Sequence, residues 1–117
     1  LTVRCILQTV NYLLIMNSNN QIKQILHSIS KIVKENVDCK YKLFLFGSRA
    51  AGTNDIKADI DIGVIPKSEL SARQMQSIKG SLEELPTLIK IDFIDFSSVS
   101  DDFKSIALLN TKEIVFD

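Results

Sequence analysis

One segment constrains the fold of this chain more than any other, and it reads YKLFLFGSRAAGTNDIKADIDIGVI over residues 41–65. The run Tyr41–Phe46 is short, aromatic and apolar and ends at a glycine, which predicts a buried strand rather than a helix. Residues 58–65 then alternate, so that Asp59 and Asp61 share one face of a second strand while isoleucine and valine share the other. The segment therefore predicts two strands joined by a Gly-Ser turn and a polar loop.

The turn and the second strand carry groups that suit two different ions. Gly47 lets a ligand approach the main chain because it has no side chain, and Ser48 adds a hydroxyl and a backbone N–H. If residues 48–51 begin a short helix, its unpaired N–H groups can bind an anion. Asp59 and Asp61 repel each other unless a cation lies between them, and carboxylate oxygens suit Mg²⁺. We therefore expect an anion site and a magnesium site joined by a short loop.

The spacing of these groups resembles a known family. Gly47-Ser48, ten further residues and then Asp59-Ile60-Asp61 match the G-S-x10-D-x-D signature of the DNA polymerase β-like nucleotidyltransferases. GSRAAGT followed by ADIDIGV is similar to the minimal nucleotidyltransferase (MNT) group in particular. Either half alone is common, whereas both halves at this spacing are much more specific. The resemblance extends from about residue 18 to the C-terminus.

The resemblance implies transfer of a nucleoside monophosphate, with AMP expected, from an NTP such as ATP to an acceptor hydroxyl. It implies that Asp59 and Asp61 bind two Mg²⁺ ions together with a third carboxylate, from a strand that we expect over residues 89–96. That strand contains Asp92 and Asp95, which a regular strand sends to opposite faces. The V-D-L-x-D pattern of the family implies Asp92 as the third catalytic and metal-binding residue. Asp95 is then expected to be solvated or to order a loop.

Three further residues are candidates for contact with the nucleotide. By resemblance, Gly47 and Ser48 hold the β- and γ-phosphates through N–H and hydroxyl groups. Arg49 is open to two interpretations, as a solvated turn residue or as a ligand of triphosphate oxygens, and its place after Gly-Ser favours the phosphates. Lys90 has the same strand parity as Asp92, so it could contact phosphate or pair with that aspartate.

Several other kinds of site are excluded by the residues present. Residues 47–52 have the G-x-x-x-x-G frame of a P-loop, but the lysine that must follow is absent, which excludes a P-loop ATPase. Cys5 and Cys39 lack metal-ligand spacing, and we expect free thiols in a reducing cytosol. His27 lies in an amphipathic segment and is expected at the surface. With 14 basic and 14 acidic residues and no basic stripe, the chain alone is not expected to bind a long nucleic acid.

Hydrophobic periodicity and capping signals predict the remaining elements. Helices are expected over residues 18–34, 71–85 and 101–109, and a short edge strand or packed tail over residues 112–116. Both Ser18 with Gln21 and Ser71 with Gln74 fit the capping-box pattern. The order of helix, strand, Gly-Ser turn, strand, helix, strand and helix predicts an α/β (α+β) fold, in which helices flank a small mixed sheet.

Residues 1–15 fit this domain poorly. Their apolar residues are interrupted by polar ones, so the segment is too short and too polar to span a bilayer. It is also a poor match to a signal peptide. We interpret residues 1–15 as an extension of doubtful authenticity and residues 16–117 as a single nucleotidyltransferase domain, expected in the cytoplasm and without contact to a membrane.

The resemblance also implies a partner. These elements leave no segment for a separate acceptor-binding domain, which the similar aminoglycoside nucleotidyltransferases normally have. MNT proteins typically work beside a small helical HEPN protein, often as the antitoxin of a toxin–antitoxin pair. A HEPN-type partner modified with AMP is therefore expected. The alternative is a non-catalytic binding module that neutralises a helical partner by contact, but the three aspartates favour catalysis.

Overall fold

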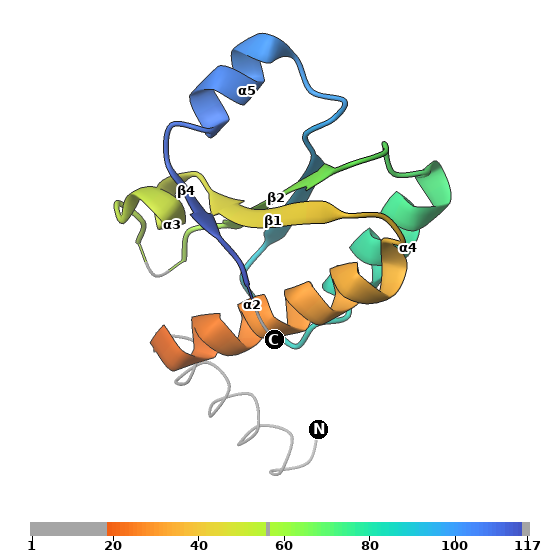
Figure 1. The fold of residues 1–117 in the computed structure, drawn as a ribbon. Helices are drawn as coiled ribbons and strands as arrows, with labels where there is room; N and C mark the ends of the chain where they lie inside the picture. The colour runs from red at the N-terminus through yellow and green to blue at the C-terminus, as the bar shows by residue number, and fades with distance from the viewer. Residues whose placement is uncertain (1–18, 56, 116–117) are drawn as a thin grey trace, which may run out of the picture.

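The computed structural model describes residues 19–55 and 57–115, and within them four strands form one mixed sheet (Figure 1). The strand order is β3-β2-β1-β4. β1 pairs antiparallel with β2 and with β4, whereas β2 pairs parallel with β3. The strands are β1 (Tyr41–Phe46), β2 (Ile60–Pro66), β3 (Ile91–Asp95) and β4 (Thr111–Glu113). The predicted small mixed sheet is thus confirmed.

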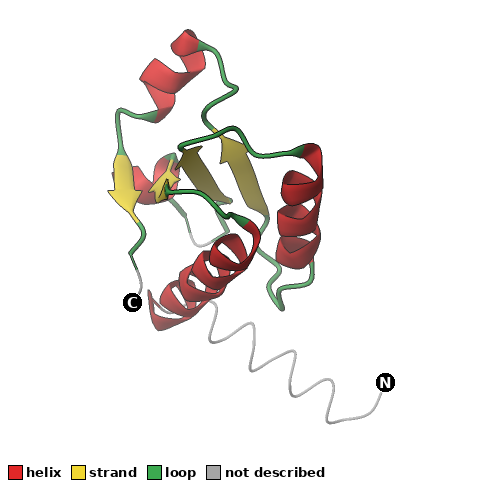
Figure 2. Ribbon diagram, turned by 45° about the vertical axis from the view of Figure 1, so that its right-hand side comes forward, coloured by secondary structure: helices red, strands yellow, loops and turns green. Residues whose placement is uncertain are grey.

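Helices lie on both sides of this sheet (Figures 1 and 2). α2 (Asn19–Asn36) and α4 (Ala72–Glu83) cover one face, and α5 (Asp101–Ala107) lies over the other. The four-residue helix α3 (Ser48–Ala51) follows β1 directly. Ser71 and Gln74 form the predicted capping box at the start of α4, while Ser18 and residues 1–15 lie outside the described residues.

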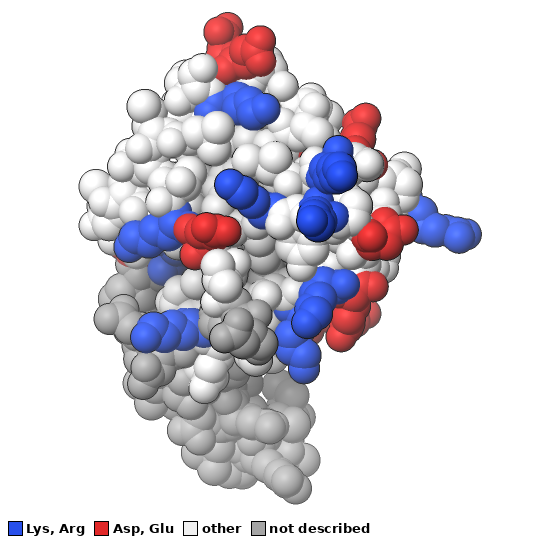
Figure 3. Space-filling view, in the orientation of Figure 1, with Lys and Arg blue, Asp and Glu red and all other residues white. Residues whose placement is uncertain are grey.

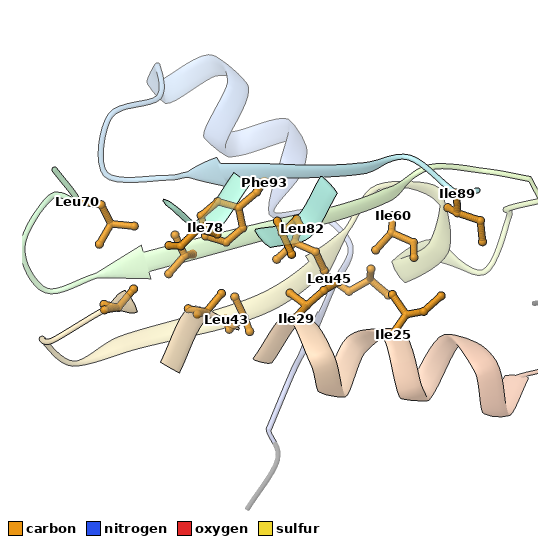
Figure 4. Close-up of a cluster of buried hydrophobic side chains, with 14 residues drawn as sticks. Ile25, Ile29, Leu43, Leu45, Ile60, Leu70, Ile78, Leu82, Ile89 and Phe93 are labelled. Atoms are coloured by element: carbon orange, nitrogen blue, oxygen red, sulfur yellow. The ribbon is translucent and has the colours of Figure 1, made fainter. Parts of the chain in front are cut away.

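The main core fills the space between the sheet and the helices α2 and α4 (Figure 4). Side chains of one parity on β1 and β2 point into it, as the alternation in the sequence predicts. Because this face takes up the aliphatic side chains, the opposite face is left for the aspartates and the aromatic rings. The core residues that are fully shielded from solvent are Ile29, Val33, Ile60, Ile62, Val64 and Ile78.

A second, aromatic cluster lies on the opposite face of the sheet. Phe44 and Phe46 of β1 and Phe96, directly after β3, are all buried there. The rings of Phe44 and Phe96 have centroids 4.9 Å apart, and Phe103 of α5 packs 5.8 Å from the Phe96 ring. This cluster connects α5 to the sheet, and it forms the apolar border of the site described below.

Two remaining predictions concern the surface. Every helix among residues 19–55 and 57–115 is too short or too polar to span a bilayer. On the face seen in Figure 3, aspartate and glutamate side chains are scattered among the lysine and arginine side chains, several of which lie next to one another. Cys39 carries a free thiol and His27 is exposed, as expected from the sequence.

Candidate functional site

Two of the predicted aspartates lie opposite each other on neighbouring strands. The parallel register of β2 and β3 makes Asp61 the Cα partner of Asp92, and both are half-buried. Burial raises the pKa of Asp61, and the charges of Asp92 and Asp59 and a hydrogen bond with Asp92 raise it further, while Lys90 lowers it. The structure therefore concentrates negative charge at one point of the sheet, on the same face as the aromatic cluster.

The third predicted aspartate lies beside this pair but not on the strand. Asp59 is exposed and precedes β2, which begins at Ile60 and not at residue 58 as the sequence predicted. The ladder to β3 begins only at Ile60, whose N–H donates to the carbonyl of Lys90 over 2.9 Å. The carbonyl of Ala58, two residues earlier, instead accepts hydrogen bonds from the side chain of Arg49.

The donor atoms fit a hard divalent cation, although the side chains are not assembled around one. Carboxylate oxygens are the ligands that Mg²⁺ prefers, and a cation would relieve the repulsion that raises the pKa of Asp61. Among residues 19–55 and 57–115, no three His, Cys, Asp or Glu side chains are yet grouped as metal ligands. Asp61 and Asp92 are therefore a candidate pair of cation ligands, and Asp59 lies near them.

The Gly-Ser turn lies directly against this pair. Gly47 has φ 75° and ψ −155°, and the preceding Phe46 is the Cα partner of Asp61. A Cβ atom at position 47 would overlap Oδ2 of Asp61 and lie 3.3 Å from its Cγ. Ser48 then begins α3, so the condition set for a short helix over residues 48–51 is met. A ligand that contacts the main chain at Gly47 would therefore also be next to the Asp61 carboxylate.

Arg49 makes a contact that neither interpretation of the sequence included. Its Nε and Nη2 both donate to the carbonyl oxygen of Ala58, over 3.1 and 2.9 Å. Burial lowers the pKa of Arg49, whereas the charges of Asp55 and Asp59 raise it. The guanidinium is therefore directed at the loop that leads to Asp59, and it is only partly solvated.

Two hollows adjoin the site, and two aromatic side chains line both of them. The first, of about 660 Å³, is lined by Asp61, Asp92 and Lys90 among others. The second, of about 440 Å³, is lined by Gly47 and Ser48 together with residues of α5. The residues common to both linings are Phe46 and Phe103, whose rings are 6.4 Å apart. The aspartate pair and the Gly-Ser turn thus open to solvent on either side of this aromatic pair.

Two further charged residues, Lys90 directly before β3 and Asp95 at its end, have different surroundings. Lys90 lies 3.5 Å from Oδ1 of Asp92, which supports pairing as its role in this structure. Asp95 faces away from the pair and is buried, so it is not solvated. Its carboxylate accepts hydrogen bonds from the N–H of Leu70 and from the N–H and hydroxyl of Ser97, over 3.1, 2.9 and 2.6 Å. Asp95 therefore orders the loop between β2 and α4 and the turn directly after β3.

One residue of the site was not identified from the sequence. Gly63 lies two residues after Asp61 on the same face, and a Cβ atom there would overlap the ring of Phe44 and lie 2.6 Å from Cε1 of Phe96. The only signal available was a glycine inside an apolar strand, which is typical of a close approach by a neighbouring group.

Comparison with known proteins identifies the family of the chain. A family model described as "Polymerase beta, Nucleotidyltransferase" matches residues 20–117. The chain is also similar to the probable protein adenylyltransferase MntA of Haemophilus influenzae, with 25% identity over 79 residues, which are 68% of this chain and 69% of the relative.

Solved structures share the fold. One contains an MNT antitoxin in complex with the tri-AMPylated HEPN toxin of Shewanella oneidensis, with a TM-score of 0.61 and 22% identity over 81% of this chain and 73% of that one. Another, described as a toxin–antitoxin with AMP-PNP, has a TM-score of 0.59 and 23% identity over 79% of this chain and 73% of that one. A putative nucleotidyltransferase from Sulfolobus solfataricus has a TM-score of 0.52 and 17% identity over 78% and 77%.

Proposed function

The chain belongs to the polymerase beta nucleotidyltransferase family, and from this premise we propose that it transfers AMP from ATP to a hydroxyl group of a HEPN-type partner protein in the cytoplasm. The observation that carries the proposal is the contact of the Gly47 turn with Asp61, which itself faces Asp92 across two strands. This proximity supports the proposal, because transfer from an NTP requires a phosphate site next to a magnesium site.

Each residue of the site has a role in this reaction. Asp59, Asp61 and Asp92 would hold two Mg²⁺ ions, which supply charge neutralisation on the phosphates and a more acidic acceptor hydroxyl. The N–H of Gly47 and the hydroxyl of Ser48 would hold the β- and γ-phosphates. Positioning and charge neutralisation carry most of the catalysis of phosphoryl transfer, so no further acid–base pair is needed.

The transfer itself exchanges one P–O bond for another. The acceptor oxygen attacks the α-phosphorus, the bond from that phosphorus to the oxygen bridging to the β-phosphate breaks, and pyrophosphate leaves. We assign to Asp92 a part in accepting the proton of the acceptor hydroxyl, and its position at the border of the larger hollow, beside Asp61, supports this role. The expected products are the AMP-modified acceptor and pyrophosphate.

The relatives support a protein as the acceptor. The Haemophilus influenzae relative is described as a probable protein adenylyltransferase, and one structural neighbour is an MNT antitoxin bound to a tri-AMPylated HEPN toxin. By analogy, we propose that this chain is the antitoxin of such a pair and inactivates its partner by AMP transfer. The alternative function is neutralisation of a helical partner by contact alone.

Co-expression with the candidate HEPN-type partner distinguishes these two functions. We expect the wild-type chain to add AMP to the partner, detected by intact mass, and the variants Asp59→Asn and Asp61→Asn to lose this transfer while remaining folded. Asp102→Asn, which changes an exposed aspartate at the start of α5, is the matched control and should transfer normally. Neutralisation by Asp59→Asn as efficient as by wild type would instead favour binding by contact.

A further inference from the structure

Arg49 forms a fork on a single backbone oxygen at the edge of the site. Two of its donors, Nε and Nη2, converge on the carbonyl of Ala58, the residue directly before Asp59. We propose that Arg49 is a positioning residue that sets the Asp59 carboxylate for cation binding, and that it is not a ligand of the triphosphate. This inference rests on the proposed function, in which Asp59 is one of the metal-binding aspartates.

The residues directly before and directly after Asp59 are both fixed by hydrogen bonds. Asp59 itself lies outside the β-ladder and is exposed. On its N-terminal side, Arg49 holds the carbonyl of Ala58, and on its C-terminal side, Ile60 donates to the carbonyl of Lys90. The position of Asp59 relative to Asp61 therefore depends on a side chain that lies ten residues earlier in the sequence.

The contact requires the shape of an arginine. A guanidinium presents several N–H donors in one plane, so two of them can converge on one carbonyl oxygen, whereas a lysine ammonium makes a single flexible contact. Arg49 is half-buried and is the second residue of α3, the helix that begins at Ser48. The Arg49 side chain therefore connects the turn proposed to hold the phosphates to the loop that carries Asp59.

Electrostatics favour the same role. The guanidinium interacts with the charges of Asp55 and Asp59, so its positive charge is directed toward the carboxylates of the loop. A change that removes the fork should loosen the loop and misplace Asp59, but it should leave the Gly47–Ser48 turn intact. If Arg49 instead bound the phosphates, its loss would weaken nucleotide binding directly and would leave the loop and Asp59 in place.

The test compares Arg49→Lys and Arg49→Gln with Arg73→Gln, a control on an exposed arginine of α4. For Arg49→Gln we expect kcat for AMP transfer to fall roughly tenfold or more, a size typical of residues that orient metal ligands, with the KM for ATP within about twofold of wild type. Arg49→Lys should recover part of the loss. Mn²⁺ binding, followed by electron paramagnetic resonance without nucleotide, should weaken, and amide exchange in the loop between α3 and β2 should accelerate.

Two outcomes would overturn the inference. One is an Arg49→Gln variant that binds ATP and inorganic tripolyphosphate more weakly by the same factor while its loop exchange stays unchanged, as expected of a phosphate ligand. The other is unchanged Mn²⁺ affinity and unchanged exchange. If the wild-type chain transfers no AMP, the proposed function fails, but Mn²⁺ binding and amide exchange still decide the role of Arg49.

Discussion

Gly47 lies so close to Asp61 that any side chain at position 47 would occupy the space of the Oδ2 atom of Asp61. The same glycine has φ 75°, in the region that residues with a side chain rarely adopt. Two independent constraints therefore require glycine here, one from the backbone of the turn and one from the neighbouring carboxylate. The Gly47 turn therefore packs directly against the carboxylate of Asp61.

Gly47→Ala should abolish AMP transfer and destabilise the fold. The backbone strain alone costs about 1–3 kcal/mol, and the new methyl group must displace the Asp61 carboxylate or widen the gap between β1 and β2. Urea unfolding measures the stability change, and transfer of AMP to the partner measures the effect on the site.

Gly52→Ala separates these two causes. Gly52 has φ 77° at the C-terminus of α3, but a Cβ atom there would meet nothing within 4 Å. The variant should lose about 1–2 kcal/mol of stability, the cost of the left-handed conformation for a residue with a Cβ atom, and keep its transfer activity. Equal loss of activity in Gly47→Ala and Gly52→Ala would show that contact with Asp61 is not the reason for glycine at position 47.

The raised pKa of Asp61 predicts a particular dependence of stability on pH. A folded-state pKa above the ordinary value of 3.8 means that the folded protein binds this proton more tightly than the unfolded chain does. In the absence of divalent cations, this stabilisation is present at low pH and is lost as the pH rises from 3.8 through the raised pKa. Asp61→Asn should therefore raise Tm at neutral pH relative to wild type.

Thermal unfolding in EDTA between about pH 4 and about pH 7 checks this sign. The difference in Tm between Asp61→Asn and wild type should grow with pH, because only the wild type acquires the unfavourable charge. Adding Mg²⁺ should raise the Tm of wild type more than that of the variant. A Tm for Asp61→Asn below that of wild type at neutral pH, without cations, would contradict the assigned direction.

The two aspartates of β3 should respond oppositely to substitution. Asp95→Ala removes the acceptor for the buried N–H of Leu70 and for Ser97, which should cost about 2–3 kcal/mol, while the folded fraction still transfers AMP. Asp92→Ala should leave stability within about 1 kcal/mol, because the exposed contact with Lys90 contributes little, but it should abolish transfer. The opposite pattern would mean that the strand face was assigned incorrectly.

Much of this site followed from local rules of sequence. β1 was predicted at its observed bounds, Tyr41–Phe46, because its apolar run ends at a glycine. The assignment of Asp92 over Asp95 followed from strand parity together with the family pattern, and the register then placed Asp92 opposite Asp61. Parity predicts which face a residue occupies once the strand exists, but it does not show where a ladder begins, so Asp59 was placed on β2.

The contacts between segments that are distant in the sequence could not be predicted from local rules. The bond from Arg49 to the carbonyl of Ala58 closes a loop whose shape depends on the backbone, and no residue type in the loop signals it. Gly63 is a similar case. Its neighbours come from β1 and from the residue after β3, so the rings that exclude a side chain meet only when the sheet has formed.

Gly63→Ala tests whether the aromatic cluster is as tightly packed as this contact indicates. The added methyl group must push aside the rings of Phe44 and Phe96, whose centroids are 4.9 Å apart, and overpacking of this kind costs about 1–3 kcal/mol. Because Phe96 also packs against Phe103 of α5, displacement of its ring should move the aromatic wall that both hollows share. We therefore expect a lower Tm together with a higher KM for ATP.

Gly80→Ala is the matched control, since Gly80 lies on the exposed side of α4 with nothing within 4 Å of a new Cβ atom. Alanine is the better helix former, so this variant should gain about 0.5–1 kcal/mol and leave KM unchanged. The two glycine-to-alanine changes are thus expected to shift Tm in opposite directions. If Gly63→Ala were as stable as wild type, the rings of Phe44 and Phe96 would have to yield freely, and the cluster could not hold α5 in place over the site.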